Sequence, residues 1–362
     1  MSNKCTLLID GNWLLMSRVA VLMKEFEKDN NEIILEEAQK DLKELLAKSI
    51  NIILNRFPII DNIIMISDGG SWRKQLPIPK SLKDITYKGN RVSEVEHDWN
   101  RIFECLTYLS NKCRELGITT CNHSMIEGDD WIWYWSKKLN SLGTNCIIWS
   151  ADNDLKQLVQ LDKSNNCFTV WYNDNYGLWL PEDFNIPKMN DIEFFMNPIY
   201  TSSVLEHIKT RAKKSINFIN PNSIINSKII CGDNSDNIMA VARFEKNNRN
   251  YKISEKDWGK IRDEIGVNTV QEFLDKKDII CKCIIKSKKF SPYNLKIKDV
   301  LEMIDYNTKL VWLNEKIIPE TIISFMNTIE YNVYDISYLR SNYKTLCPND
   351  EDIENIFDSI NF

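Results

Sequence analysis

The sequence lacks the patterns that usually hold zinc or form disulfides. It has only three histidines, and its ten cysteines include no C-x-x-C pair, so a zinc site is not expected. Most of the cysteines lie inside apolar segments, which indicates reduced, buried thiols in a cytoplasmic protein. No apolar run approaches the ~20 residues that span a membrane. The N-terminus also lacks the basic and then apolar plan of a signal peptide.

Positive charge is also in short supply. The chain has 46 basic and 51 acidic residues, a formal charge of −5, which argues at first against a nucleic-acid partner. Nine of the carboxylates are candidates for a metal site, however, and removing those nine negative charges from −5 leaves +4. The overall charge therefore excludes little, and the positions of the charges along the chain are more informative.

The first half of the chain alternates short apolar strands with helical stripes. Strands are expected at 6–9, 62–67, 119–122, from 146, and in a hairpin over 167–180; helices are expected at 13–26, 35–57, 97–116, 127–143 and from 154. This alternation predicts an α/β domain over residues 1–190 with a parallel sheet. Beyond it the strands stop, and helices are expected at 191–213, 255–265, 268–276, 297–313 and 319–329. Residues 191–362 are therefore predicted to form a second, helical domain.

Acidic residues follow the ends of the predicted strands. Asp10 ends the first strand, Asp68 follows the second, and Asp152 follows the strand from 146. Ligands bind outside the carboxyl ends of parallel strands, so these side chains are expected to converge. The full candidate set is Asp10, Asp68, Glu127, Asp129, Asp130, Asp152, Asp154, Asp233 and Asp236. Crowded carboxylates need cations, and oxygen-only ligands select Mg²⁺ or Mn²⁺.

The same acidic residues also have an ordinary structural interpretation. Asp152 and Asp154 would cap a helix, and Asp233 and Asp236 would form a turn. The complete set favours metal binding, because two cations ~3.5–4 Å apart could activate a water and stabilise the leaving oxygen of a phosphodiester.

The helix expected after Glu127 carries three tryptophans. Trp131 and Trp135 can share one face, but Trp133 cannot join them. We therefore expect at least one of them to face solvent or a domain interface, although core packing is favoured over base stacking for the group.

Residues 71–96 form a basic stretch that is too long for an ordinary connection. It contains Pro77 and Pro79, and loops of this length are typically functional or disordered. Its cations are candidates for holding a phosphate: Arg73, Lys74, Lys80, Lys83, Lys88 and Arg91. The alternative for Lys88 and Arg91 is a solvated charged face.

Five short motifs then occur in a fixed order. They are Asp68-Gly-Gly-Ser-Trp-Arg73-Lys74, Tyr87-Lys88-Gly89-Asn90-Arg91, Glu127-Gly-Asp129-Asp130, Ser150-Ala-Asp152-Asn-Asp154-Leu155 and Gly232-Asp233-Asn-Ser-Asp236-Asn237. In this order they resemble the 5′ nucleases, the family of flap endonucleases and 5′→3′ exonucleases, over about residues 4–330. Within that family the chain most resembles the ribonuclease H of T-even bacteriophages.

The resemblance implies a fold and a set of roles. The fold is a PIN-like α/β nuclease core with a mostly parallel sheet and helices on both faces, a helical arch at about 71–96, and a C-terminal helical domain that binds duplex DNA. The nine carboxylates would hold two Mg²⁺, for which Mn²⁺ can substitute, with Asp233 and Asp236 completing the second site. Asp130 and Asp152 would serve catalysis, and Lys88 and Arg91 would contact the scissile phosphate.

The chain departs from the family after the last motif. Many relatives carry there a glycine-rich helix-hairpin that binds duplex phosphates, often with K⁺. Residues 238–251 contain no glycine. K⁺ is therefore a doubtful cofactor, and Arg243, Lys246 and Arg249 are expected to grip the backbone instead.

The expected function is Mg-dependent 5′→3′ exonuclease and flap endonuclease activity with ribonuclease H activity, which removes RNA primers and 5′ flaps in phage-type DNA replication. The substrates would be branched or nicked duplex DNA and RNA–DNA hybrid, and the protein would act as a monomer in a bacterial host's cytoplasm. Two alternatives remain, a catalytically weak branched-DNA-binding protein on the same fold and a PIN-type ribonuclease of free RNA. The complete carboxylate set argues against the first alternative, and the basic arch and helical last third argue against the second.

The C-terminal tail, residues 348–362, has its own character. It carries five acidic residues, and Ile353, Ile356, Phe357 and Ile360 would share one face of a helix. Such a segment suits a groove on another protein, here a sliding clamp or a single-strand-binding protein. The alternative is that the tail packs on its own domain.

Overall fold

The computed structural model describes most of the chain in two compact units. It describes residues 4–29, 35–82, 85–90, 99–184, 203–212, 215–247 and 249–347. The first unit, called the sheet unit here, comprises Met1–Gly70, His97–Ile219 and Ser324–Phe362. The second, the helical unit, comprises Ser71–Glu96 and Asn220–Ile323. The basic stretch thus groups with the helical unit, whereas the sequence assigned it to the first domain.

The sheet unit is built on a mostly parallel sheet with the order β3-β2-β1-β4-β6-β7-β8. The strands are β1 Cys5–Asp10, β2 Asn62–Ile66, β3 Thr119–Cys121, β4 Asn145–Trp149, β5 Gln160–Asp162, β6 Cys167–Asn173, β7 Gly177–Pro181 and β8 Ile216–Ile219. Strands β3, β2, β1, β4 and β6 run parallel, while β5 and β7 each pair antiparallel with β6. The predicted fold class and the hairpin are confirmed.

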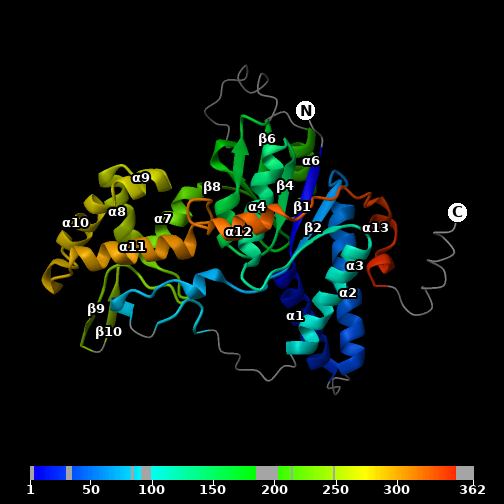
Figure 1. The fold of residues 1–362 in the computed structure, drawn as a ribbon, viewed down its shortest axis with the longest axis horizontal. Helices are drawn as coiled ribbons and strands as arrows, with labels where there is room; N and C mark the ends of the chain where they lie inside the picture. Colours follow the sequence, from blue (N-terminus) through cyan, green and yellow to red (C-terminus); the bar gives the residue numbers. More distant parts are fainter. Residues whose placement is uncertain are drawn as a thin grey trace. The chain divides into compact units, whose positions relative to one another are not determined.

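Helices pack on both faces of this sheet. They are α1 Gly11–Asp29, α2 Leu35–Arg56, α3 Trp99–Glu115, α4 Gly128–Ser141, α6 Ser203–Arg211 and α13 Ser337–Ser341. Strand residues alternate between faces: Leu7, Ile9 and Ile147 share a core with α1, α2 and α3. Helix α4 contacts β1, β2, β4 and β6, and Figure 1 shows α2 and α3 running alongside each other. This core fixes the strand ends that carry the acidic residues.

The three tryptophans of α4 are all buried, so the expectation that one of them faces outward is wrong. Trp131 and Trp135 are fully buried and Trp133 is 5% exposed. Residues after 324 cover two of them. The Phe325 ring lies 6.2 Å from that of Trp131, and the Tyr331 ring lies 5.7 Å from that of Trp135. None of the three tryptophans is therefore available on the surface for base stacking.

The helical unit contains five helices within the ranges that the structure describes, and a two-stranded hairpin. The helices are α7 Pro221–Cys231, α8 Glu255–Ile265, α9 Val270–Asp275, α10 Lys277–Lys286 and α11 Ile297–Val311; α12 Glu320–Asn327 spans the boundary of the two units. Four of the predicted helices are confirmed, whereas α7 and α10 were not predicted. Capping boxes start α8 at Ser254 and α9 at Thr269, where the sequence places an acidic residue three positions later.

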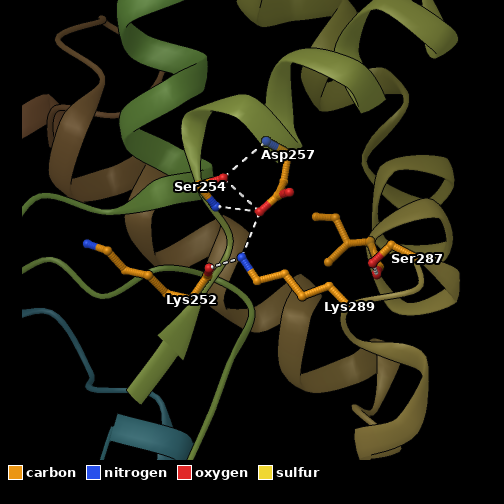
Figure 2. A network of polar contacts seen from close by, with 6 residues as sticks. Lys252, Ser254, Asp257, Ser287 and Lys289 are labelled. Atoms are coloured by element: carbon orange, nitrogen blue, oxygen red, sulfur yellow. Dashed lines mark hydrogen bonds and ion pairs between the residues drawn. The ribbon is translucent and has the colours of Figure 1, made fainter. Parts of the chain in front are cut away.

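The hairpin, β9 Arg243–Lys246 and β10 Arg249–Lys252, occupies the glycine-free stretch after the last motif. Its root is fastened to the helices by Lys289, whose Nζ donates to Asp257 Oδ2 and to the Lys252 carbonyl, both at 2.7 Å (Figure 2). Burial alone would raise the pKa of Asp257, but hydrogen bonds from Lys289 and Ser254 hold that pKa at about 2. On its inner side Phe244 stacks on Tyr293 with ring centroids 3.6 Å apart. These contacts give the hairpin a fixed base.

None of the helices in the described ranges combines the length and the apolar character that crossing a lipid bilayer requires.

Candidate metal and nucleic-acid site

The seven acidic candidates of the sheet unit stand at the carboxyl-terminal edge of the sheet. Asp10 is the last residue of β1, and the register pairs Ile9 with Met65 of β2 and with Trp149 of β4. The three strands therefore end side by side. Asp68 and Asp152 follow β2 and β4, and Glu127 precedes the first turn of α4. The sequence placed these residues at one edge because parallel strands end together, and the structure does the same.

Asp10 is the centre of this edge. Its Oδ1 accepts a hydrogen bond from the Trp13 backbone N–H at 3.0 Å, and its Oδ2 accepts one from the Ser150 hydroxyl at 2.6 Å. Burial raises the pKa of Asp10 to about 7, and the charges of Asp68 and Asp152 push it in the same direction. Three of the predicted ligands are thus electrostatically coupled. A group held in this way gains from a nearby cation, which favours its ionised form.

Asp68 is held against the start of α4. Its Oδ1 accepts a hydrogen bond from the Gly128 backbone N–H, at the end of the helix where the dipole favours a negative charge. A Cβ at Gly128 would come within 2.8 Å of that same oxygen, so only glycine lets the carboxylate approach so closely. The Asp68 backbone N–H in turn donates to Asn12 Oδ1 at 3.0 Å. Asp129 and Asp130 follow in the same turn, so the Glu127-Gly-Asp-Asp motif and Asp68 form one cluster.

Asp152 and Asp154 lie on a turn, and the helix predicted after them is wrong. The Asp152 backbone N–H donates to Ser150 Oγ at 2.9 Å, and Asp152 Oδ1 accepts from the Asp154 N–H at 2.8 Å. The chain then makes only a 3₁₀ turn, Asp154–Leu158, before it enters β5. The apolar spacing of Leu155, Leu158 and Val159 fits this turn as well as a helix. The strand that pairs with β6 takes up the residues a helix would have used.

The chemistry of this cluster fits a hard divalent cation, although its present arrangement is not a closed metal cage. The donors are all carboxylate oxygens, the ligands that Mg²⁺ and Mn²⁺ prefer. Among the described residues, no group of three or more histidine, cysteine or acidic side chains is arranged so that it could hold a metal ion. Protein donors already contact oxygens of Asp10, Asp68 and Asp152. Each carboxylate still has further lone pairs that can take a cation.

The other two acidic candidates belong to the helical unit, on the loop that follows α7. Asp233 is paired: Lys228 Nζ lies 2.5 Å from its Oδ2, and the Ser235 hydroxyl donates to its Oδ1 at 2.6 Å. Burial alone would raise the pKa of Asp233, but these partners hold it below its usual range. Asp236 is buried and receives the Tyr87 hydroxyl at 3.5 Å. That the two residues complete a second metal site stays a prediction.

This acidic loop is fastened to the foot of the basic stretch. The Lys88 backbone N–H donates to the Asp236 carbonyl at 2.9 Å, and Asn90 Nδ2 donates to the Asn234 carbonyl at 3.0 Å. In the other direction Asn237 Nδ2 donates to the Thr86 carbonyl at 2.8 Å. Lys88 is a non-glycine residue in the left-handed region, with φ of 55°, which these bonds maintain. The Tyr-Lys-Gly-Asn motif and the Gly-Asp-Asn-Ser-Asp-Asn motif, whose first residues Tyr87 and Gly232 are 145 positions apart, therefore form one structural piece.

The basic candidates differ in their surroundings. The described part of the predicted arch has two short 3₁₀ turns, Trp72–Gln75 and Lys80–Leu82. The resemblance implies a helical arch, whereas Pro77 and Pro79 favour an irregular one, as is observed here. Arg73 is buried, whereas Lys74 and Lys80 are exposed. On the hairpin, Lys246 and Arg249 are exposed, and Arg243 donates to the Ser81 carbonyl at 3.1 Å. Lys83, Arg91 and the tail 348–362 lie outside the described residues.

Comparisons with known proteins bear on the fold. No protein-family model matches the chain, and no curated protein does. Among solved structures, a bacteriophage T5 flap endonuclease, crystallised as a pseudo-enzyme–product complex with DNA and metal ions, matches over 93% of this chain and 100% of its own, with 16% identity and a TM-score of 0.51. The T5 5′-exonuclease with bound zinc ions matches over 90% and 99%, with 16% identity and a TM-score of 0.50.

The chain has the fold of the T5 5′-exonuclease. Within this exonuclease fold, the residues that the sequence did not single out are those that orient the acidic groups. Ser150 joins Asp10 to Asp152, Asn12 holds Asp68, and Asn237 holds the foot of the basic stretch. Ser150 and Asn237 stand inside the quoted motifs, and Asn12 stands two residues after Asp10. Their proximity to the aspartates was the available signal, but their bonds reach across strands and could not be read from spacing.

Proposed function

We propose that the protein is a divalent-metal-dependent 5′ nuclease that acts on branched or nicked nucleic acid. The observation that carries the proposal is the coupling of Asp10, Asp68 and Asp152 at the ends of three neighbouring parallel strands. The fold supports it, since the matching bacteriophage T5 flap endonuclease was crystallised with DNA and metal ions. In full, the proposal is a Mg-dependent 5′→3′ exonuclease and flap endonuclease with ribonuclease H activity that removes RNA primers and 5′ flaps during phage-type replication.

The carboxylates of the sheet unit would hold the metal. Asp10, Asp68 and Asp152 would supply its oxygens, with Glu127, Asp129, Asp130 and Asp154 around them, and Asp233 and Asp236 would serve a second ion. Bound Mg²⁺ would supply an activated water and a charge at the leaving oxygen. Ser150 fixes the orientation of Asp10 and the backbone of Asp152 at the same time. The Ser150 hydroxyl would therefore hold both residues in position while their carboxylates turn toward a cation.

The basic stretch would hold the substrate phosphate. Lys88 and Arg91 are proposed to contact the scissile phosphate, and Arg73, Lys74, Lys80 and Lys83 the adjoining backbone. The attachment of Lys88 to the Asp236 carbonyl supports a fixed position for this lysine. A cation held in place before the substrate arrives stabilises developing charge without reorganisation.

The hairpin would bind the duplex in place of a glycine-rich, K⁺-binding turn. Its register sets Lys246 opposite Arg249 and Arg243 opposite Lys252, so like charges face each other across both pairs. Such pairs destabilise a hairpin by themselves. Phosphates between them would remove the repulsion, which supports Arg243, Lys246 and Arg249 as duplex ligands.

A binding protein without strong catalysis is the second candidate, and one observation favours it. The oxygens of Asp10, Asp68 and Asp152 already accept hydrogen bonds from protein donors. A chain that only bound branched DNA would need no metal and could keep those bonds permanently. The nuclease remains preferred, because such a protein would have no use for a carboxyl group whose ionisation burial opposes.

Digestion of 5′-labelled substrates decides between the two. Wild-type protein would be incubated with nicked duplex, 5′-flap and RNA–DNA hybrid substrates, in Mg²⁺ and in EDTA. The nuclease is expected to cleave in Mg²⁺ alone and to bind in both. Binding in both buffers with no product in Mg²⁺ or Mn²⁺ would favour the binding protein.

The tail is proposed to dock on a replication partner, either a sliding clamp or a single-strand-binding protein. Its acidic residues would repel DNA and leave its apolar face for protein. Deletion of 350–362 should leave melting temperature and unaided cleavage unchanged while removing stimulation by the partner. A truncated protein that melts several degrees lower would assign the tail to the core.

A further inference from the structure

A pocket opens at the foot of the basic stretch, within the helical unit. Its volume is about 310 Å³. Three cations line it, Arg73, Lys74 and Lys88, together with a wall that includes Leu76, Ile78 and Tyr306. No acidic side chain is among the described residues that line it. The pocket therefore combines a concentration of positive charge with an apolar surface.

The frame of the pocket is fixed by bonds to the acidic loop. Thr86 and Lys88, both in its lining, are held through the Thr86 carbonyl and the Lys88 N–H by Asn237 and Asp236. Tyr87 between them is 7% exposed and packs in the core of the helical unit. The lining of the pocket is therefore formed before a ligand enters, which lowers the entropic cost of binding.

The composition of the lining selects the class of ligand. Lysine and arginine side chains bind phosphate oxygens, so these cations indicate a ligand that carries a phosphate group. A bare phosphate would leave the wall of Leu76, Ile78 and Tyr306 without a partner. A base and sugar fit that wall, because a tyrosine face accepts any base. A pocket of this size is at the lower end of those that bind small molecules.

The neighbouring groove sets the direction in which the ligand lies. Leu76, Ile78 and Tyr306 also line a larger groove of about 640 Å³ against α11, which contains Glu302 and Asp305. The groove also contains Lys298 and Lys309, which balance these two carboxylates, whereas every charged residue that lines the pocket is a cation. The phosphate end is therefore expected on the side of Lys74 and Lys88. The base end points toward the shared apolar wall.

We propose that this pocket binds one nucleoside 5′-phosphate unit, with the phosphate on Lys74, Lys88 and Arg73 and the base against Ile78 and Tyr306. The unit is either one nucleotide of a nucleic-acid strand or a free mononucleotide, which share this chemistry. The first of these sources rests on the proposed nuclease function, whereas the pocket itself does not.

Two matched tryptophan substitutions test the pocket. Ile78 and Ile297 are 39% and 40% exposed, so neither substitution disturbs a core. Ile78 lines the pocket, whereas Ile297 lines only the larger groove. Ile78→Trp should fill the pocket while leaving its cations in place, and Ile297→Trp is the control. The probe is deoxythymidine 5′-monophosphate in EDTA, with thymidine and inorganic phosphate as separate titrations, followed by calorimetry.

The full-length wild-type protein should bind the monophosphate at least about tenfold more tightly than either part. Ile78→Trp should weaken that binding about tenfold or more, and Ile297→Trp should leave it unchanged. Equal binding of phosphate and monophosphate would overturn the proposal, since the site would then be a bare anion site. Equal affinities of the two variants would also overturn it.

Cleavage kinetics then identify the source of the unit. If the pocket takes a nucleotide of the strand, Ile78→Trp raises KM for a flap substrate and Ile297→Trp does not. If it takes a free mononucleotide, KM stays unchanged in both, and added monophosphate inhibits wild type but not Ile78→Trp. Both results support the pocket. Because the calorimetry is done in EDTA without cleavage, an absence of nuclease activity would contradict the proposed function and leave the pocket's own test intact.

Discussion

The two units of this chain carry opposite charge. The sheet unit has 22 basic and 33 acidic residues, a formal charge of −11, and the helical unit has 24 basic and 18 acidic residues, a charge of +6. In the sheet unit the candidate ligands Asp10, Asp68 and Asp152 are at strand ends, where burial raises the pKa of Asp10. In the helical unit the candidate phosphate ligands stand on an irregular stretch and a hairpin. An excess of one charge weakens a compact unit, and a ligand of the opposite charge relieves it. The net charge of −5 for the whole chain conceals the negative charge of the sheet unit and the positive charge of the helical unit.

Removing one carboxylate from the sheet unit should have the largest effect. Asp152→Asn is expected to lower kcat by about 10³-fold or more in Mg²⁺, because the metal that stabilises the transition state loses a charged ligand. DNA affinity, which we propose to reside mainly in the helical unit, should change little. Asp41→Asn, at an exposed carboxylate of α2, is the control. Wild-type turnover by Asp152→Asn would rule out the metal role of the sheet unit.

Removing one cation from the foot of the basic stretch should come next. Lys88→Met keeps the length of the side chain and the backbone conformation, so it tests the charge alone. It is expected to lower kcat by about 10²-fold with little change in affinity, since a cation on the scissile phosphate acts mainly on the transition state. Lys80→Met should instead weaken binding and reduce its salt dependence. Identical binding losses in both variants, with turnover intact, would show that Lys88 is only one cation of a binding surface.

Much of the sheet unit could be predicted from the sequence because its signals are local. Buried strands read as short apolar runs, and Asp10, Asp68 and Asp152 stand at the end of such a run or within a few residues of it. The helix after Asp154 was not foreseen correctly, since a 3₁₀ turn and a helix share the same first turn of apolar spacing. The burial of all three tryptophans of α4 was also missed, because part of their cover comes from Phe325 and Tyr331, which are distant in the sequence.

The helical unit was less predictable because its organising contacts are long-range. The bond from Asn237 to the Thr86 carbonyl joins residues 151 apart, and no periodicity reports such a pair. The β9–β10 hairpin has exposed residues on both strands, so it lacks the apolar alternation that would reveal a strand. The absence of glycine argued against the glycine-rich turn that the resemblance implies, but it did not predict the hairpin that occupies this stretch.

Neutralising the tip of the hairpin should produce a smaller effect on affinity. The double variant Lys246→Gln/Arg249→Gln is expected to reduce the slope of log affinity against log salt by about 1.8, which corresponds to two phosphate contacts. Its melting temperature should stay level or rise, because two like charges no longer face each other. Glu245→Gln, on the same strand, should raise affinity. An unchanged salt slope in the double variant would remove the hairpin from the DNA-binding surface.

Asp10 allows the charge of the sheet unit to be tested without substrate. Its folded pKa of about 7 lies above the usual ~3.9, so ionisation destabilises the fold as pH rises between these two values. At pH 8 in EDTA, Asp10→Asn should therefore have a free energy of unfolding roughly 1–3 kcal/mol larger than that of wild type, and a higher melting temperature. Both differences should vanish near pH 4. Adding Mg²⁺ should narrow the gap by stabilising only the wild type. A constant difference across this pH range would contradict the role of the Asp10 charge.

The smallest expected effect concerns the root of the hairpin, where the helical unit does hold a paired acid. The pKa of Asp257 is about 2, below its unfolded value, so its stabilising contribution is present above about pH 4 and is lost as pH falls toward 2. Its partner Lys289 is about one-third exposed, so Lys289→Gln should cost only about 0.5–1 kcal/mol at pH 7.

Hydrogen exchange of the hairpin amides is the appropriate readout, because Lys289 also binds the Lys252 carbonyl. At pH 7 the hairpin amides of Lys289→Gln should exchange faster than those of the control Lys288→Gln, which changes an exposed neighbour. Near pH 2 the exchange rates of the two variants should become equal. If both variants exchange alike at pH 7, the hairpin is held by Phe244 and its aromatic neighbours, and the ion pair contributes nothing measurable.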